Sequence, residues 1–428
     1  MSPDLNEPKP TGRNPWAWIP SLYFAEGLPN VLVATVSVVF YKNLGLTNAA
    51  AAFYTSWLYL PWVLKPLWSP VVDAWRTRRG WIPAMQFLMG AAFAGVALTL
   101  SAAHFLQFTL ALLWLVAFSS ATHDIAADGF YILANSERRQ AAFSGVRSVA
   151  FNIAKLFAQG SLVALAGILK ERCGSFMAAW AIVFALAAVI FLALAVYHRL
   201  VLPRPDGDAP GNADSVKASN FFAVFADYFR KPQIALLLAF LLLYRLGEAQ
   251  LLKIAQPFLL DPRAAGGLGL SNQALSLVYG TVGLVALICG GLLGGILISR
   301  RGLRFWLWPM LLAIHLPDAV FIWLAYAQPQ NVCAIGAGVA VEQFGYGFGF
   351  AAYMLYMIYI ARGRHATAHY AICTGFMALG LMLPGMWSGW LQEQLGYRHF
   401  FVWVIFATIP SFLVALKIPL DKEFGKKN

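Results

Sequence analysis

The chain has 428 residues, of which 60% are hydrophobic and 12% are charged, with a formal net charge of +12. Soluble globular proteins contain about 25% charged residues, so this composition excludes a soluble protein and indicates one embedded in a lipid bilayer. The basic excess would suit a nucleic acid partner, but the lysines and arginines gather in segments expected to face the cytoplasm. The charge therefore indicates a topology with both termini in the cytoplasm, and no nucleic acid partner is expected.

A membrane-spanning helix needs about 20 mostly apolar residues, and we predict twelve such segments. Residues 1–15 are polar and proline-rich, lack the features of a cleaved signal peptide, and are expected to form a cytoplasmic tail. Residues 16–198 are predicted to form one six-helix bundle and residues 233–418 a second one, followed by a cytoplasmic tail at 419–428. The predicted spans are centred near residues 28, 58, 92, 118, 155, 187, 247, 285, 315, 347, 381 and 409.

The first span contains a carboxylate, Glu26, and the seventh contains another, Glu248, at a matching place in the second half. Each is followed by an apolar run and then by a similar short sequence, Gly45-Leu-Thr-Asn48 or Gly269-Leu-Ser-Asn272. Many secondary transporters are duplicated bundles with functional groups at equivalent depths. Because a charge inside the membrane is costly, both glutamates are predicted to take part in proton coupling.

The loop after the second span reads Lys65-Pro-Leu-Trp-Ser-Pro-Val-Val-Asp73 and continues into a cluster of arginines. We predict a conformational latch here, in which Asp73 caps or pairs with a neighbouring helix end while Arg76, Arg78 and Arg79 hold the inner leaflet. The alternative is a plain basic turn on the cytoplasmic side, which explains the arginines but not the aspartate.

The fourth span carries Asp124 and Asp128, and the spacing of four places both on one helical face. Two like charges on one face in a low dielectric favour protonation of at least one of them, so both are candidates for proton coupling. For Asp128 a structural ion pair with Arg147 of the fifth span remains an equal alternative.

Polar residues also lie in the fifth, seventh, ninth and tenth spans, the ninth contributing His315 and Asp318, and together they imply a wet cavity between the halves. Lys155 is a compact charge that could bind a solute carboxylate or neutralise Asp124, and Arg245 could bind the solute or pair with Glu248. The predicted solute-binding residues are Tyr23, Asn152, Lys155, Gln159, Arg245, Gln250, Glu342, Gln343 and Tyr346.

Residues 199–232 form the longest polar stretch inside the chain and are expected to be a flexible cytoplasmic linker. Near its end, aromatic and aliphatic residues recur at helical spacing, which predicts a short amphipathic helix on the inner membrane surface. Six plus six spans around a central cytoplasmic loop describe an all-α membrane protein with the major facilitator fold.

Other kinds of chemistry find no support in the sequence. The four cysteines are isolated, and there is no phosphate-binding loop, no nucleophile–base pair and no metal-ligand spacing. Gly345, Gly347 and Gly349 lie in an apolar span and indicate close helix packing rather than a nucleotide site. We therefore expect no enzyme activity, no cofactor and no metal.

Three motifs carry a family resemblance: Gly27-Leu-Pro29, the Lys65 to Asp73 segment, and Asp124-Ile-x-x-Asp128 followed by Glu137-Arg138. They resemble the AmpG-type muropeptide permeases, a branch of the major facilitator superfamily that includes acetyl-CoA transporters and some siderophore permeases. The resemblance implies proton-driven import of cell-wall sugar-peptides across a bacterial inner membrane. It also marks Asp124 and Asp128 as essential.

We therefore expect a monomeric transporter that rocks its two halves to give alternating access. Its partners would be protons, the bilayer, and a small anionic or amphiphilic solute such as an anhydro-muramyl sugar-peptide. A siderophore, acetyl-CoA or another glycan-derived solute is the alternative within the same fold. A receptor or scaffold without transport is the alternative from another class, and the desolvation of charges on several spans argues against it.

Overall fold

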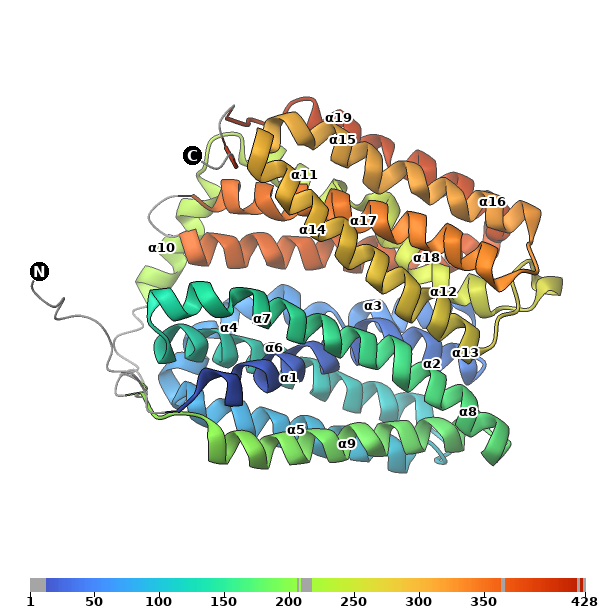
Figure 1. Cartoon of the computed structure of the whole chain (residues 1–428), viewed down its shortest axis with the longest axis horizontal. Helices are drawn as coiled ribbons and strands as arrows, with labels where there is room; N and C mark the ends of the chain where they lie inside the picture. Colours follow the sequence, from blue (N-terminus) through green and yellow to red (C-terminus); the bar gives the residue numbers. More distant parts are fainter. Residues whose placement is uncertain (1–12, 206–207, 209–217, 363–365, 422–423, 426–428) are drawn as a thin grey trace, which may run out of the picture.

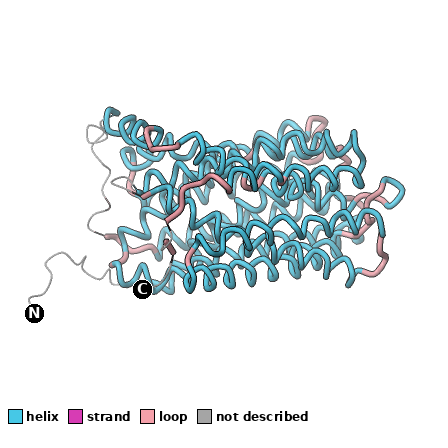
Figure 2. Tube along the Cα trace, turned by 90° about the horizontal axis from the view of Figure 1, so that it is seen from above, coloured by secondary structure: helices cyan, strands magenta, loops and turns pink. Residues whose placement is uncertain are grey.

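The structure, a computed structural model, describes residues 13–205, 208, 218–362, 366–421 and 424–425. In this part of the chain the regular elements are helices, and no strand occurs. The helices run side by side along the long axis, and most loops lie at its two ends (Figures 1 and 2). We call the end at which α1 begins and α19 ends the near end, and the opposite end the far end.

The two halves of the chain form two layers, with the first half below the second in Figure 1. The helix α10 (Ala218–Phe229) connects the halves at the near end. The first half contains α1 (Ile19–Val31), α2 (Ser37–Asn43), α3 (Asn48–Trp57), α4 (Leu60–Trp75), α5 (Arg78–Thr99), α6 (Phe105–Ala134), α7 (Glu137–Lys155), α8 (Val163–Cys173) and α9 (Phe176–Val201). The second half contains α11 (Ile234–Leu243), α12 (Leu246–Leu260), α13 (Asn272–Leu275), α14 (Leu284–Arg301), α15 (Leu303–His315), α16 (Ala319–Ala327), α17 (Val332–Ala361), α18 (Ala366–Ala407) and α19 (Ile409–Ala415).

Ten helical segments among the described residues are long and apolar enough to cross a membrane. One of them, Ala368–Ala415, has 48 residues, far more than the about 20 that one crossing needs, and Gly396 inside it leaves the helical conformation at φ 68°. The span expected near residue 58 is formed by α3 and α4 and is not among the ten. The all-helical membrane fold is confirmed, whereas the number of twelve spans stays a prediction.

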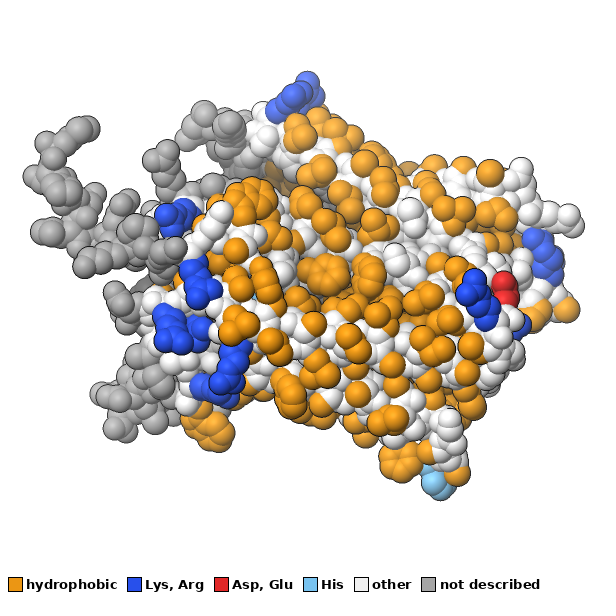
Figure 3. Space-filling model, turned by 60° about the horizontal axis from the view of Figure 1, so that its bottom comes forward, with side chains coloured by type: hydrophobic (Ala, Val, Ile, Leu, Met, Phe, Trp, Pro, Cys, Tyr) orange, Lys and Arg blue, Asp and Glu red, His pale blue; other side chains and the backbone are white. Residues whose placement is uncertain are grey.

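The surface fits a membrane-embedded bundle. Apolar side chains cover the middle of the face shown in Figure 3, and lysines and arginines gather towards its two ends. Such an apolar band between charged ends is what a bilayer requires of the protein surface that it contacts.

Three spans are interrupted by a stretch of π-helix, in which the turn is wider than in an α-helix. These stretches are Leu32–Val36 (η2) between α1 and α2, Leu156–Leu162 (η3) between α7 and α8, and Ser276–Gly283 (η6) between α13 and α14. Insertions of this kind occur frequently at functional sites. Here they lie where the two halves meet, because η3 packs against both η2 and η6.

Close backbone contacts hold α17 against its neighbours. A Cβ atom on Gly345 would lie 2.1 Å from the carbonyl oxygen of Ala313, and one on Gly347 would lie 2.0 Å from that of Leu287. Only glycine allows α17 to approach α14 and α15 this closely. The packing role predicted for the glycine stripe is confirmed.

Candidate functional site

The carboxylates of the first half form one cluster on α1 and α6. Asp124 is 7% exposed, forms an ion pair with Lys65 (Nζ–Oδ2 3.6 Å) and accepts a hydrogen bond from the Trp62 indole (3.1 Å). The charges of Asp124 and Asp128 both act on Glu26, which lies on the facing helix α1. Oδ1 of Asp124 and Oε2 of Glu26 are buried and accept no hydrogen bond within the described structure. The first half therefore holds buried carboxylate oxygens whose charge is incompletely compensated.

Asp128 forms the pair with Arg147 that the sequence left as an alternative. The distance between the guanidinium nitrogen and Oδ1 is 2.5 Å, and the hydroxyl of Tyr23 donates to the same oxygen at 3.0 Å. The guanidinium also lies over the rings of Tyr23 and Tyr131, 4.2 and 4.3 Å from their centroids. Tyr23 is thus engaged within the first half, and Asp128 is the outermost member of the cluster, with 43% of its side chain exposed.

The second half contains an acidic cluster of its own. Glu248 on α12, Asp318 in the short 3₁₀-helix η7 (Leu316–Asp318) and Glu342 on α17 each bring an oxygen within 4.8 Å of the others. All three are at most 1% exposed, and Gln343 donates to both oxygens of Glu342 at 3.3 and 3.0 Å. Carboxylates so close in a low dielectric could share protons or hold a hard cation such as Mg²⁺ or Ca²⁺. Sequence analysis placed Glu248 and Glu342 among the site residues, whereas it noted Asp318 only as a charged residue of the ninth span.

Two cations predicted to bind solute face each other across the halves. Arg245 begins α12, donates to the hydroxyl of Tyr346 at 2.5 Å and lies over the ring of Phe350 at 4.9 Å. Lys155 ends α7 and lies over the ring of Phe151 at 5.2 Å, where the charge of Arg245 acts on it. The ion pair of Asp124 is formed with Lys65 and not with Lys155, because Lys65 on α4 reaches the same face of α6.

A cavity of about 60 Å³ lies between the halves, on the far side of these cations. The first half contributes Ala34, Thr35, Val38 and Tyr59 to its lining. The second half contributes Ala249, Leu252, Lys253, Gln256, Tyr279 and Leu381. Its volume admits a group of a few atoms, such as one carboxylate, and not a whole sugar-peptide.

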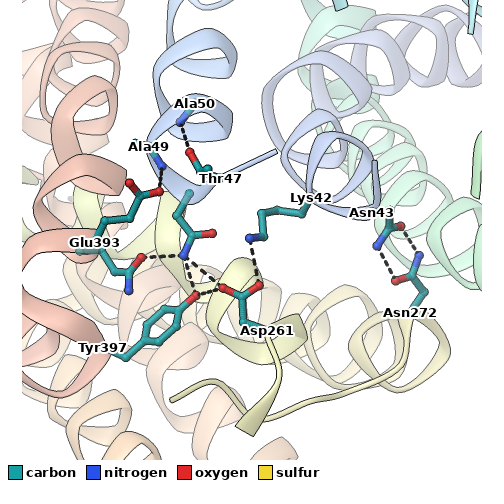
Figure 4. Close-up of polar contacts among 11 residues, drawn as sticks. Lys42, Asn43, Thr47, Ala49, Ala50, Asp261, Asn272, Glu393 and Tyr397 are labelled. Atoms are coloured by element: carbon teal, nitrogen blue, oxygen red, sulfur yellow. Dashed lines mark hydrogen bonds and ion pairs between the residues drawn. The ribbon is translucent and has the colours of Figure 1, made fainter. Parts of the chain in front are cut away.

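A network of polar side chains joins the two halves at the far end (Figure 4). Asp261 forms an ion pair with Lys42 (2.9 Å) and accepts hydrogen bonds from Tyr397 (2.5 Å) and Asn48 (3.2 Å). Asn48 also donates to Gln392 at 2.6 Å. Lys42 and Asn48 belong to the first half and the other three residues to the second, so the network closes the far end; we call these five residues the far-end network.

The repeated short sequences of the two halves form the same local structure at the far end. Gly45 and Gly269 adopt left-handed backbones (φ +88° and +66°), and the following Thr47 and Ser271 each cap a helix. The next residue of each repeat is an asparagine that reaches the other half. Asn48 enters the far-end network, and the amides of Asn272 and Asn43 exchange two hydrogen bonds of 2.6 and 3.2 Å (Figure 4). Sequence analysis used these repeats only as a sign of duplication, although their position already pointed to the interface.

The arginines of the predicted latch lie at the near end. The backbone amides of Arg78 and Arg79 donate to the two oxygens of Asp208 (2.8 and 3.0 Å), which therefore caps α5. Arg79 also donates to the carbonyls of Leu202 and Arg199, and Arg76 is exposed. The side chain of Asp73 lies outside the described part of the structure, so the latch stays a prediction.

Of three further residues predicted to bind solute, the structure places one at a cavity and one away from it. Gln159 lines a smaller cavity beside Gln256 and Tyr279, and Asn152 is partly buried on α7. Gln250 is fully buried and points into the second half, where it accepts a hydrogen bond from Trp403 at 3.0 Å. The structure therefore does not bring Gln250 to the cavity.

A buried chain of hydrogen bonds in the first half was missed from sequence. Gln86 lies between His123 and His198, with 2.9 Å to a ring nitrogen of each, and His198 reaches Ser21 at 2.9 Å. Gln86 and the two histidines are fully buried on α5, α6 and α9. These hydrogen bonds favour one rotation of α6 about its axis, and Asp124 follows His123 directly on that helix. A glutamine and two histidines isolated in apolar spans were the available signal.

Comparisons with known proteins agree with this architecture. Residues 21–383 match the family model of the Major Facilitator Superfamily. The chain is 25% identical over 419 residues to the anhydromuropeptide permease of Escherichia coli (strain K12), with 95% of this chain and 80% of that protein covered. It is 24% identical over 410 residues to the protein named "Putative transporter AmpG 4" of Rickettsia conorii, with 92% of this chain and 94% of that protein covered. The resemblance to AmpG-type permeases is confirmed.

Solved structures show the same fold at low sequence identity. A bacterial homologue of the lysosomal transporter Spinster, in an inward-facing and unoccupied conformation, matches with a TM-score of 0.66 and 17% identity, covering 94% of each chain. The nucleoside transporter NupG matches with a TM-score of 0.63 and 14% identity, covering 94% of this chain and 98% of that one. The chain thus belongs to the Major Facilitator Superfamily and is a multi-pass membrane transporter rather than an enzyme.

Proposed function

We propose that this transporter imports an anionic sugar-peptide of the anhydromuropeptide type, together with protons, across a bacterial inner membrane by alternating access. Both termini then face the cytoplasm, and the far end faces outwards. Similarity to the anhydromuropeptide permease over 95% of the chain supports the class of solute. The observation that carries proton coupling is a pair of carboxylates, Glu26 and Asp124, each with one buried oxygen that accepts no hydrogen bond in the described structure.

The charge balance of the first-half cluster supports the proton-carrying role. Glu26, Asp124 and Asp128 face two cations, Lys65 and Arg147, so one carboxylate remains uncompensated when all three are ionised. An uncompensated buried charge is expensive, and a proton removes it. In this proposal Asp128 stays paired with Arg147, while Glu26 and Asp124 exchange the proton. Glu248 is the counterpart in the second half and takes part through its acidic cluster.

The cations between the halves support an anionic solute. Lys155 and Arg245 present two cations from opposite halves, and Tyr346 and Phe350 supply rings beside them. An anhydromuropeptide carries a sugar and a carboxylate-bearing peptide, which match rings and cations respectively. Asn152, Gln159, Glu342 and Gln343 offer further polar contacts, and the transporter works as a monomer.

Uptake into proteoliposomes tests this proposal. Purified protein should accumulate labelled anhydromuropeptide when the lumen is alkaline, and Asp124→Asn should abolish this accumulation because the amide cannot carry a proton. Exchange of labelled for unlabelled solute without a gradient should persist in the variant. Asp421→Asn, which removes an exposed carboxylate paired with Arg362, is the matched control and should accumulate solute as the wild type does. Gradient-driven accumulation by Asp124→Asn at the wild-type rate would remove Asp124 from the mechanism.

A further inference from the structure

Lys253 is a buried cation that crosses the boundary between the two halves. It lies on α12 of the second half and is 6% exposed, and its described hydrogen bonds and ring contact are with the first half. Its ammonium donates to the hydroxyl of Thr55 at 3.1 Å and to the carbonyl oxygen of Ala34 at 3.4 Å, and it lies 5.1 Å from the centroid of the Tyr59 ring. Sequence analysis did not include it among the solute-binding residues.

The described partners of Lys253 are neutral, as are those of Lys155 and Arg245, whereas three other cations of the bundle are paired with carboxylates. Lys42, Lys65 and Arg147 each form an ion pair with a carboxylate, whereas no carboxylate oxygen lies within 4 Å of the Lys253 ammonium in the described part of the structure. A desolvated cation held only by neutral oxygens is poorly compensated. An anion that reaches it therefore gains more than it would at an already paired lysine.

The cavity of about 60 Å³ gives an anion access to this ammonium. Lys253 lines it together with Tyr59, Gln256 and Tyr279, which add donors beside the cation. A hydrogen bond between an ammonium and a carboxylate adds the attraction of opposite charges, which a bond from the ammonium to a neutral oxygen lacks. A carboxylate in the cavity would thus draw the ammonium away from Thr55 and Ala34.

We propose that Lys253 binds an acidic group of the solute and that this contact replaces its hydrogen bonds to the first half. The proposal rests on the proposed function, because it assigns to one residue the recognition of the solute's carboxylate. It adds that solute binding weakens the contact between the halves, because the two displaced bonds join η2 and α3 to α12. Lys253 precedes Asp261 of the far-end network by about two turns of this helix.

The Lys253 side chain is packed at the interface between the two halves. A Cβ atom on Gly385 of α18 would lie 2.7 Å from the hydroxyl oxygen of Ser56 and 3.1 Å from Cγ of Lys253. The lysine stem is therefore packed closely between α18 and α3, while its ammonium borders the cavity. Displacement of the ammonium towards the cavity would remove its two hydrogen bonds to the first half and so weaken the contact between the halves.

Two natural cysteines allow the far end to be measured directly. Cys173 ends α8 in the first half and Cys333 lies near the start of α17 in the second, and both are exposed at the far end. Spin labels on these two residues, in a Cys289→Ser background, report the separation of the halves by pulsed electron paramagnetic resonance. The buried Cys373 is left in place.

The probes are labelled anhydromuropeptide and an analogue whose carboxylates are converted to amides. In the wild type the carboxylate form should bind about 10- to 100-fold more tightly than the amide form and should increase the population with a long label distance. In Lys253→Met, which keeps the length of the side chain, both forms should bind with similar weak affinity and neither should change the distances. Lys42→Met is the matched control: it removes a lysine of the far-end network and should retain the preference for the carboxylate form.

The outcomes separate the two proposals. Equal weakening of both probes by Lys253→Met, or an unchanged response to the carboxylate form, overturns the role of Lys253. If neither form binds the wild type, the muropeptide proposal fails. The anion site is then tested with citrate and inorganic phosphate, by measuring the label distances in the wild type and in Lys253→Met. A distance change that requires Lys253 supports the site, and no change with either anion overturns it. Should Lys253→Met not fold, the wild-type preference for carboxylate over amide still tests whether an anion is required.

Discussion

Asp261→Asn should open the far end. Asp261 accepts three hydrogen bonds or ion-pair contacts, from Lys42, Asn48 and Tyr397. The asparagine keeps an acceptor for Tyr397 but loses the charge that attracts Lys42, and it places an amide NH₂ beside another donor. Because hydrogen bonds to charged groups contribute about 1.5–3 kcal/mol each, and the pair is partly open to solvent, we expect a loss of about 2–3 kcal/mol for the closed state.

This loss corresponds to a roughly 30- to 150-fold rise in the ratio of open to closed molecules. The measurement is the distance between spin labels on Cys173 and Cys333, which lie at the far ends of the two halves. Lys42→Met should have a similar effect, and the double variant should open the far end by less than the sum, with a coupling of about 1–2 kcal/mol. Glu393→Gln is the matched control, since its exposed carboxylate reaches only a backbone amide of the first half, that of Ala49. Additive single effects, or an equal opening by Glu393→Gln, would refute the network as the closing element.

Three further predictions concern packing and burial. Gly389→Ala should prevent closure and abolish uptake by the folded protein, because its Cβ would lie 2.1 Å from the carbonyl oxygen of Asn48; Gly295→Ala, which meets nothing within 4 Å, should be neutral in the same assay. Gln86→Leu should lower the free energy of unfolding by about 2–4 kcal/mol in a detergent melt, since it removes the hydrogen-bond partner of one ring nitrogen in each of two buried histidines. Gln250→Leu should lower the melting temperature while KM for the solute stays unchanged, and a raised KM at wild-type stability would return Gln250 to the binding site.

The membrane class and the duplicated architecture could be predicted from sequence because both depend on local properties. Apolar length decides whether a segment can cross the bilayer, and no folding partner is needed to recognise it. The repeats ending in Asn48 and Asn272 are local as well: a glycine with positive φ and a capping hydroxyl form the same turn in each half. The closely packed glycine stripe of α17 follows from residue size alone.

The candidate residues could be found from sequence, but their partners could not. Ionisable residues stand out in apolar spans, so Glu26, Asp124, Asp128 and Glu248 were identified as single residues. In a spanning helix that is apolar on all sides, hydropathy has no helical period. The sequence therefore does not show which face of the helix packs against which neighbouring helix. The choice of Lys65 over Lys155 as the partner of Asp124 was therefore open until the helices were placed.

Hydropathy, the repeated segments and the isolated ionisable residues are enough to identify a duplicated helical membrane protein with carboxylates and cations at depth. How those charges are combined depends on the packing of the helices. This packing brought Glu248, Asp318 and Glu342 together from three separate elements, turned Gln250 away from the cavity, and placed Lys253 across the interface with neutral partners. The physical reason is helix rotation, to which π-helical stretches such as Leu156–Leu162 contribute: a shift of one residue turns a side chain by about 100°, and hydropathy does not record that turn.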